Sequence, residues 1–134
     1  MNDRELMECA VEARKNSYSP YSGFKVGAAL LGKSGKVYTG CNVENAGYSS
    51  TNCAERTAVF KAVSEGEREF VSIAIVGGKG DIPADFCAPC GVCRQVLAEF
   101  CDGDFRIVLG TPDNLQVHTL ESLLPYSFGK SDLR

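Results

Sequence analysis

Two short stretches of the sequence bring together residue types that could bind a metal ion and move protons. Cys53 is followed two residues later by Glu55, and Cys90 and Cys93 form a Cys-x-x-Cys pair. Three thiolates are suitable ligands for zinc, and a zinc ion with three protein ligands keeps a fourth position open, as catalytic zinc sites do. The sequence therefore predicts a catalytic zinc site held by Cys53, Cys90 and Cys93.

Two side chains next to these cysteines are candidates for assisting the metal. Glu55 lies two residues after Cys53, so on a helix its carboxylate would point away from the sulfur and make a poor fourth ligand. It could instead take a proton from a water that the metal has made acidic and pass that proton on. Arg56 lies three residues after Cys53 on the same helical face, so we expect its guanidinium to offset the excess charge of three thiolates.

The cysteines open two predicted helices. One begins near Cys53 and runs to Glu65, where Gly66 ends it, and the other runs from Cys90 to about Cys101. A helix N-terminus carries a partial positive charge, which favours the thiolate form of a cysteine. We expect the two helix starts to meet at the end of a sheet and to bring the three sulfurs together.

The remaining hydrophobic pattern predicts the sheet that positions these helices. Asn2, with Glu5 three residues later, fits a capping box at the start of a further helix that runs to about Asn16. Another helix is expected from Thr119 to Leu124, with an irregular tail from 125 to 134. Apolar or alternating runs predict five strands, at 24–31, 36–43, 70–76, 105–110 and 115–118, and polar or glycine-rich runs predict loops at 44–52 and 77–88. Strand–helix–strand crossovers imply an α/β fold. We expect one domain over residues 1–134, with a mixed sheet of about five strands between helices in three layers.

The composition of the chain limits which classes of partner and which cellular compartment are expected. The chain has 134 residues and a net charge of −3, with a pI of about 5.2, which does not favour a nucleic-acid partner. Since an apolar run of ~20 residues is needed to span a membrane and none occurs, no membrane association is expected. Seven cysteines, an odd number, follow a charged N-terminus without the features of a secretory signal. This combination indicates the reducing environment of the cytoplasm.

The two motifs carry a family resemblance. Cys-Ala-Glu followed by Pro-Cys-x-x-Cys resembles the signature of zinc-dependent cytosine deaminases. The flanking segments are similar to cytidine deaminases of the small homotetrameric type: 24–30, 40–46, 52–58, 89–95 and 123–129. The resemblance spans roughly residues 18–133, and the three-cysteine form together with 42–46 is typical of enzymes that act on free nucleosides. It implies zinc-dependent hydrolytic deamination of cytidine and 2′-deoxycytidine to uridine and 2′-deoxyuridine, with release of ammonia, in pyrimidine salvage.

The resemblance also implies roles for individual residues. Glu55 would be the proton shuttle, and the substrate would be bound by Phe24, Asn42, Glu44, Ala46, Tyr48, Ala54 and Phe128. Within this set, Phe24 would stack on the pyrimidine, and Asn42 and Glu44 would bind the ribose hydroxyls. Ala46, Tyr48 and the region of Phe128 would complete the pocket of a neighbouring subunit, so that a homotetramer would share its active sites.

Cys87 leaves an alternative open, because it forms a second possible pair, Cys87-x-x-Cys90. We favour Cys90 and Cys93 as ligands, since Pro89 is suited to the start of the helix. With Cys87 as a fourth ligand the site would be a closed structural zinc site, and the protein a binding module without turnover. A deaminase of another aminated nucleoside is the remaining alternative, and the acidic charge balance disfavours a polynucleotide substrate.

Overall fold

The computed structural model describes residues 1–84 and 86–134, and five of its strands form one mixed sheet. The strand order is β2-β1-β3-β4-β5; β3 and β4 are parallel, and the other neighbouring pairs are antiparallel. The described elements are α1 (Asp3–Arg14), β1 (Phe24–Gly32), β2 (Val37–Cys41), the 3₁₀ turn η1 (Tyr48–Ser50), α2 (Ala54–Ser64), β3 (Phe70–Lys79), α3 (Gly91–Phe100), β4 (Arg106–Thr111), β5 (Asn114–Thr119), α4 (Leu120–Leu123) and the 3₁₀ turn η2 (Lys130–Leu133). The predicted mixed sheet of about five strands is confirmed.

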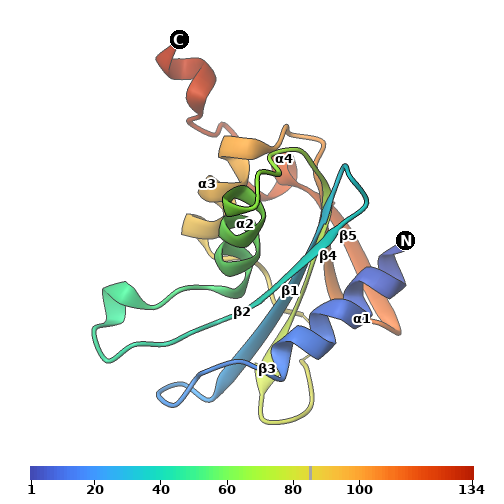
Figure 1. Ribbon diagram of the computed structural model, residues 1–134, viewed down its shortest axis with the longest axis vertical. Helices are drawn as coiled ribbons and strands as arrows, with labels where there is room; N and C mark the ends of the chain where they lie inside the picture. The colour runs from blue at the N-terminus through green and yellow to red at the C-terminus, as the bar shows by residue number, and fades with distance from the viewer. Residues whose placement is uncertain (85) are drawn as a thin grey trace.

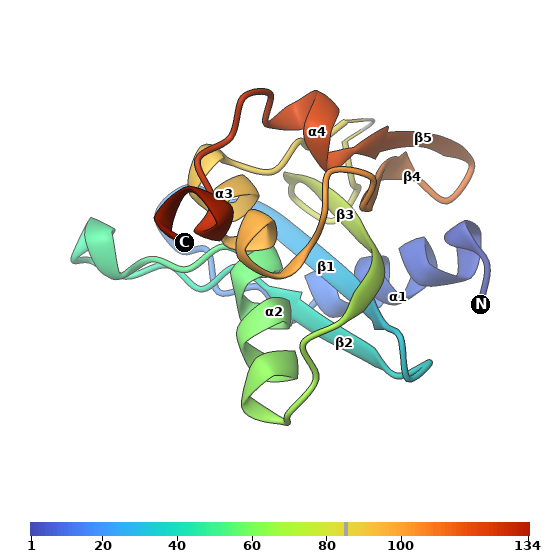
Figure 2. The ribbon, with the colours of Figure 1, turned by 90° about the horizontal axis from the view of Figure 1, so that it is seen from above.

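The helices cover both faces of the sheet in three layers (Figure 1). Helix α1 lies on one face, and α2, α3 and α4 lie on the other, as the view from above shows (Figure 2). Alternate strand residues point to opposite faces, so Ala29 of β1 packs with α1 while Ala28 and Leu30 pack with the other helices. No helix of the described residues has the length and apolar character required to cross a membrane.

The helix starts follow the capping chemistry expected from the sequence. The Asn2 side chain accepts a hydrogen bond from the backbone of Glu5, whose carboxylate accepts one from the backbone of Asn2 in return. Cys53 is the N-cap of α2 and Cys90 is the N-cap of α3. Both cysteines therefore lie at the first turn of a helix, within one residue of the predicted starts.

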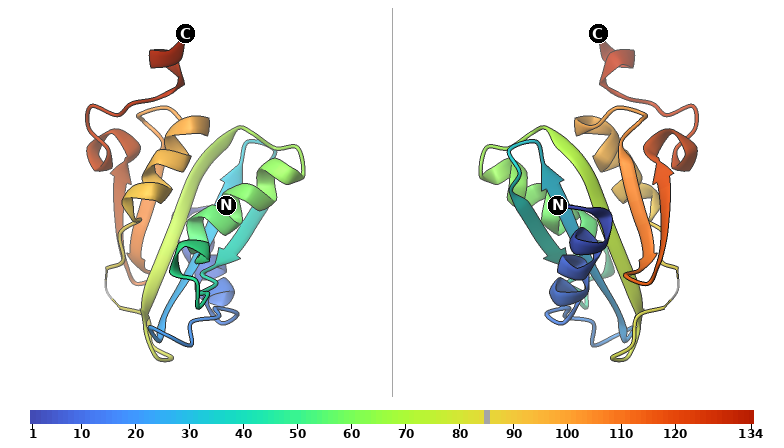
Figure 3. Two further views of the ribbon diagram at one scale, coloured as in Figure 1. Left: turned by 90° about the vertical axis from the view of Figure 1, so that its left-hand side faces the viewer. Right: turned by 90° about the vertical axis from the view of Figure 1, so that its right-hand side faces the viewer.

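Strand β3 is longer than expected from the sequence. It continues to Lys79, whereas a loop was predicted from Gly77 onward, so this part of the prediction is wrong. A Cβ at Gly77 would lie 2.7 Å from the Cys87 sulfur and 3.1 Å from the ring of Phe24, so glycine serves here to let two side chains approach the strand. Residue 85 of the predicted loop lies outside the described residues. The tail, predicted to be irregular, contains η2, which projects from the body of the molecule (Figure 3).

Helix α1 and strand β1 approach each other at Gly27. A Cβ at this position would lie 2.0 Å from the carbonyl oxygen of Ala10 and 2.6 Å from the backbone nitrogen of Arg14. Both are backbone atoms of the helix, so a side chain could be accommodated only by moving α1 as a whole. Gly27 therefore sets the distance between α1 and the sheet.

We expect Gly27→Ala to lower the free energy of unfolding by about 2–3 kcal/mol, because an inserted methyl group would overpack this contact. Gly129→Ala is the matched control, since no atom lies within 4 Å of the position of its Cβ and its φ is negative. Urea unfolding followed by circular dichroism measures the difference. Equal midpoints for the two variants would contradict the proposed packing constraint.

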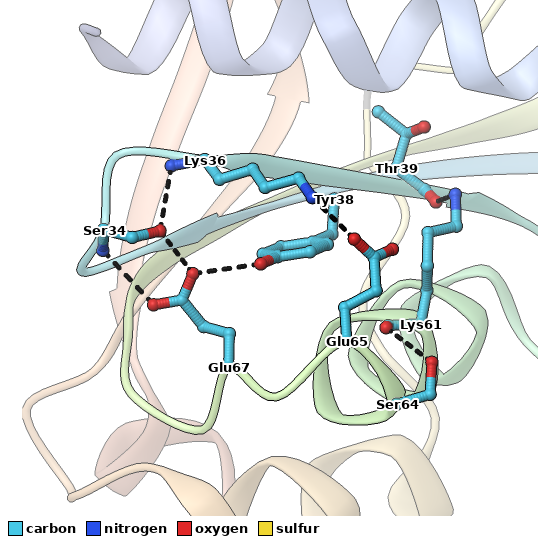
Figure 4. A network of polar contacts seen from close by, with 8 residues as sticks. All are labelled: Ser34, Lys36, Tyr38, Thr39, Lys61, Ser64, Glu65 and Glu67. Carbon is cyan, nitrogen blue, oxygen red and sulfur yellow. Dashed lines mark hydrogen bonds and ion pairs between the residues drawn. The ribbon is translucent and has the colours of Figure 1, made fainter.

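A polar network ties the far end of α2 to the turn between β1 and β2 (Figure 4). The Glu67 carboxylate accepts hydrogen bonds from the backbone and hydroxyl of Ser34 and from the hydroxyl of Tyr38, the last at 3.1 Å. Lys36 pairs with Glu65 at 2.5 Å in the same region. Glu65 and Glu67 lie in the segment that connects α2 to β3, so the network fixes this connection at the end of α2 that is farthest from Cys53.

This network predicts a pH-dependent contribution to stability. The hydrogen bond from the Ser34 hydroxyl, above all, holds the pKa of Glu67 below its ordinary value of 4.5. A lowered folded-state pKa stabilises the protein above the unfolded pKa, and this stabilisation is lost as the pH falls through the folded value. We expect Glu67→Gln to be less stable than wild type at pH 7 and to approach it at an acidic pH below the lowered folded-state pKa of Glu67, because protonation removes the charged acceptor. Urea unfolding at both pH values tests this, with Glu8→Gln, an exposed position on α1, as control. A wild-type advantage that is the same at both values would be evidence against it.

Candidate functional site

The three predicted zinc ligands lie together where α2 and α3 begin. The sulfurs of Cys53 and Cys90 are 3.6 Å apart, those of Cys90 and Cys93 are 3.4 Å apart, and all three lie within 4.8 Å of one another. Cys90 is exposed and Cys53 partly exposed, while Cys93 is buried. The expectation that the two helix starts meet and bring these sulfurs together is confirmed.

The spacing of the sulfurs fits a zinc ion. Zinc–sulfur bonds of about 2.3 Å at tetrahedral angles place two sulfur ligands about 3.8 Å apart, close to the separations found here. In the described part of the chain, these three cysteines form the one group of three or more cysteine, histidine or acidic side chains that could hold a metal. Cys87 lies outside that group, and burial raises the pKa of its thiol to about 11, which disfavours the thiolate that a metal requires.

Arg56 contacts the cluster as the sequence predicted. Its Nη2 donates to the Cys53 sulfur at 3.3 Å, and its Nε is buried without a hydrogen-bond partner among the described residues. Hydrogen bonds from Cys93 first, and then from Arg56 and Cys90, lower the pKa of Cys53 to about 5. The guanidinium and the helix start thus stabilise negative charge on the sulfurs.

Glu55 lies in the first turn of α2, next to the cluster. The residue is only 4% exposed, and burial above all raises the pKa of its carboxyl to about 7. A carboxyl with a pKa near neutrality can both accept and release a proton under physiological conditions. This is the property that a proton shuttle needs, and the assignment of that role to Glu55 stays a prediction.

The residues expected to contact a nucleoside fall into two groups. Phe24, the first residue of β1, is partly buried. The Asn42 side chain bonds the β1 backbone at two points: Nδ2 donates to the Phe24 carbonyl at 2.8 Å, and Oδ1 accepts from the Val26 amide at 2.9 Å. Glu44 lies two residues further along and bonds the turn that precedes β1. Ala54 is fully buried beside Cys53. The structure therefore brings Phe24, Asn42 and Glu44 together.

The second group lies on two segments that project from the body of the molecule (Figure 1). Ala46 and Tyr48 belong to the segment that carries η1, and Tyr48 is 78% exposed. Phe128 belongs to the C-terminal tail, is 61% exposed, and has its carbonyl bonded by the Gln95 side chain at 2.8 Å. Their predicted role in the pocket of a neighbouring subunit stays a prediction.

Two polar residues near the site, Arg94 and Ser22, make contacts that were not predicted from the sequence. Arg94 donates to the carbonyl of Pro89 at 2.8 Å and to that of Leu123 at 2.6 Å, which fixes the entry into α3 just before Cys90. Ser22 bonds Glu44 and Phe24. Both contacts cross long sequence separations or depend on turn geometry, so neither residue type nor spacing reveals them.

We expect Cys93→Ser to lose most of its bound zinc and Cys87→Ser to keep about as much as wild type, because only the first removes one of the clustered sulfurs. Metal analysis after dialysis against a weak chelator measures zinc per chain in both purified variants. Loss of zinc from Cys87→Ser would instead favour the closed site with Cys87 as a ligand.

Comparisons with known proteins place this fold and cluster in a family. Residues 1–111 match the model of the cytidine and deoxycytidylate deaminase zinc-binding region. The chain is 47% identical to cytidine deaminase of Sporosarcina psychrophila, with 99% of this chain and 96% of the relative covered, and 49% identical to that of Halalkalibacterium halodurans, with 99% and 98% covered.

Solved structures agree with this placement. The crystal structure of cytidine deaminase from Burkholderia pseudomallei matches with a TM-score of 0.88 at 46% identity, covering 96% of this chain and all of that chain. The structure from Mycobacterium tuberculosis matches with a TM-score of 0.82 at 39% identity, covering 96% and 98%. By sequence, fold and cysteine cluster, the chain belongs to the cytidine and deoxycytidylate deaminase family of zinc-binding proteins.

Proposed function

We propose that this protein catalyses the hydrolytic deamination of cytidine and 2′-deoxycytidine to uridine and 2′-deoxyuridine, a reaction of pyrimidine salvage. The observation that carries the proposal is the position of a buried carboxyl with a pKa near 7, Glu55, beside the cluster of Cys53, Cys90 and Cys93. Full-length relatives named cytidine deaminase, at 47% and 49% identity, support the choice of substrate.

The reaction requires a proton carrier as well as a metal. Cys53, Cys90 and Cys93 would hold a zinc ion, which when bound would supply a Lewis acid that makes water nucleophilic near neutral pH. Glu55 accepts the first proton of the attacking water and passes it to the ring nitrogen N3; it then accepts the second proton from the new hydroxyl on C4 and delivers it to the leaving amine. A bond from C4 to oxygen forms, the bond from C4 to the exocyclic nitrogen breaks, and ammonia leaves. Arg56 limits the negative charge on the sulfurs so that the metal remains an effective Lewis acid.

The nucleoside would be held by residues at the start of β1 and after β2. Phe24 stacks on the pyrimidine ring, and Ala54 forms part of the wall next to Cys53. Asn42 commits one hydrogen of its Nδ2 to the Phe24 carbonyl, which leaves the other for a ribose hydroxyl. The Glu44 carboxylate accepts from the second sugar hydroxyl.

The assembly proposed for this enzyme is a homotetramer with active sites shared between subunits. Its support is the exposure of Tyr48 and Phe128 on projecting segments, since aromatic side chains are enriched at protein interfaces. In that assembly, Ala46, Tyr48 and Phe128 complete the pocket of a neighbouring subunit. A single catalytic domain over residues 1–134 and a cytoplasmic location complete the proposal, and the seven free cysteines favour a reducing compartment.

Ammonia release from cytidine by wild type and by Glu55→Gln tests the activity and the shuttle together. We expect Glu55→Gln to be slower by about 10²–10⁴-fold with its zinc content unchanged, because the amide cannot carry the proton and Glu55 is not a ligand. Glu8→Gln, at an exposed position on α1, is the control for the loss of a carboxylate elsewhere.

The wild-type result also separates the alternatives. No release from cytidine by protein that holds zinc would contradict the proposed substrate and turn attention to other aminated nucleosides. If those substrates also remained unchanged, the zinc would have a structural role in a binding module.

A further inference from the structure

At Phe24, the first residue of β1, side chains make the backbone hydrogen bonds that a neighbouring strand makes elsewhere in the sheet. Strand β1 pairs with β3 from Phe24 onward, but its pairing with β2 ends at Gly27 and Cys41. On the side that faces β2, the backbone amide and carbonyl of Phe24 therefore have no neighbouring strand of the described chain as a hydrogen-bond partner. Its carbonyl accepts from Asn42 Nδ2 at 2.8 Å, and its amide donates to the Ser22 hydroxyl at 3.0 Å. Two side chains thus satisfy the backbone of Phe24, in place of a ladder.

The Ser22 hydroxyl connects this backbone to Glu44. It accepts from the Phe24 amide and donates to the Glu44 carboxylate, which forms a continuous chain of hydrogen bonds between the two residues. The same carboxylate accepts from the backbone amides of Tyr21, at 3.0 Å, and Ser22, at 3.1 Å. These bonds, that of the Ser22 hydroxyl first, lower the pKa of Glu44, so the carboxylate remains charged.

A role limited to shaping the turn would not require this arrangement. The amide bonds of Tyr21 and Ser22 to Glu44 already hold the turn before β1. The Ser22 hydroxyl adds a link between Glu44, whose carboxylate is expected to bind the sugar, and Phe24, the residue expected to stack on the base. A shift of Glu44 on binding a sugar hydroxyl would therefore act on the backbone of Phe24 through the Ser22 hydroxyl.

We propose that Ser22 is a positioning residue that couples sugar recognition at Glu44 to stacking of the base on Phe24. The inference rests on the proposed function and extends it to selectivity. In this arrangement a sugar that engages Glu44 also orders the stacking surface, because the shared hydroxyl must keep both of its bonds. The enzyme then prefers nucleosides with sugar hydroxyls more strongly than the direct sugar contacts alone provide.

The test compares cytidine with 2′,3′-dideoxycytidine, which lacks both ring hydroxyls of the sugar. The readout is the ratio of kcat/KM for cytidine to that for the dideoxynucleoside, measured with zinc-loaded protein. We expect Ser22→Ala to lower this ratio about tenfold, mainly through KM for cytidine, as loss of a hydrogen bond to a charged group does. Ser22→Thr keeps the hydroxyl and restores the ratio. Ser64→Ala, in the last turn of α2, leaves it unchanged.

A double-mutant cycle with Phe24→Leu separates coupling from a general loosening of the turn. If Ser22 acts through Phe24, Ser22→Ala lowers the ratio less than about twofold in the Phe24→Leu background. Additive effects, or an equal loss for both nucleosides together with a lower melting temperature, would overturn the coupling. An unchanged ratio in Ser22→Ala would overturn it as well. Turnover of cytidine by the wild-type protein tests the proposed function separately. If the wild type did not deaminate cytidine, both the proposed function and this inference would be contradicted.

Discussion

The convergence of three thiol groups on one point is the constraint on which the rest of the structure depends. Thiolates at separations of 3.4 and 3.6 Å repel one another, so the cluster requires positive charge around it. Two helix N-termini and the Arg56 guanidinium supply that charge, in addition to the metal. Both helices must therefore begin at the same place. This is possible because α2 and α3 pack on the same face of one sheet, with β3 between them in the chain.

Close packing of small residues fixes the positions of the helix starts relative to the sheet. The face of α2 that meets the sheet carries Ala54, Ala58 and Ala62, all fully buried, so the helix axis can approach the strands. On the opposite face Gly27 does the same for α1. A sheet held closely on both sides gives the first turns of α2 and α3 little freedom, and three sulfurs can then be held within a fraction of an ångström of zinc geometry.

The parts of the fold that follow local rules could be predicted from the sequence. The capping pair of Asn2 and Glu5 and the cysteine spacing identified helix starts to within one residue. The end of β3 could not be predicted, because glycines such as Gly77 and Gly78 are usual in loops. Here Gly77 leaves room for the side chains of Cys87 and Phe24, and this contact cannot be read from the local sequence. The strand order depends on pairing between distant segments, which periodicity does not encode. The bond from Ser22 to Glu44, 22 residues apart, was missed for the same reason.

Glu55 shows how the fold accepts a local loss of stability to keep a useful group. A rise in carboxyl pKa from 4.5 to about 7 means that the ionised form is less stable in the folded protein by about 3 kcal/mol. For a raised carboxyl pKa the unfavourable contribution is zero below the unfolded value and grows as the pH rises toward the folded one. Replacing Glu55 by an apolar residue of similar size would remove this cost. It would also remove the one buried group beside the cysteines that can exchange protons at neutral pH among the residues described. A raised pKa suits the proton-transfer role proposed for Glu55, because an exposed carboxylate with an ordinary pKa of 4.5 would be too weak a base to take a proton from water near neutral pH.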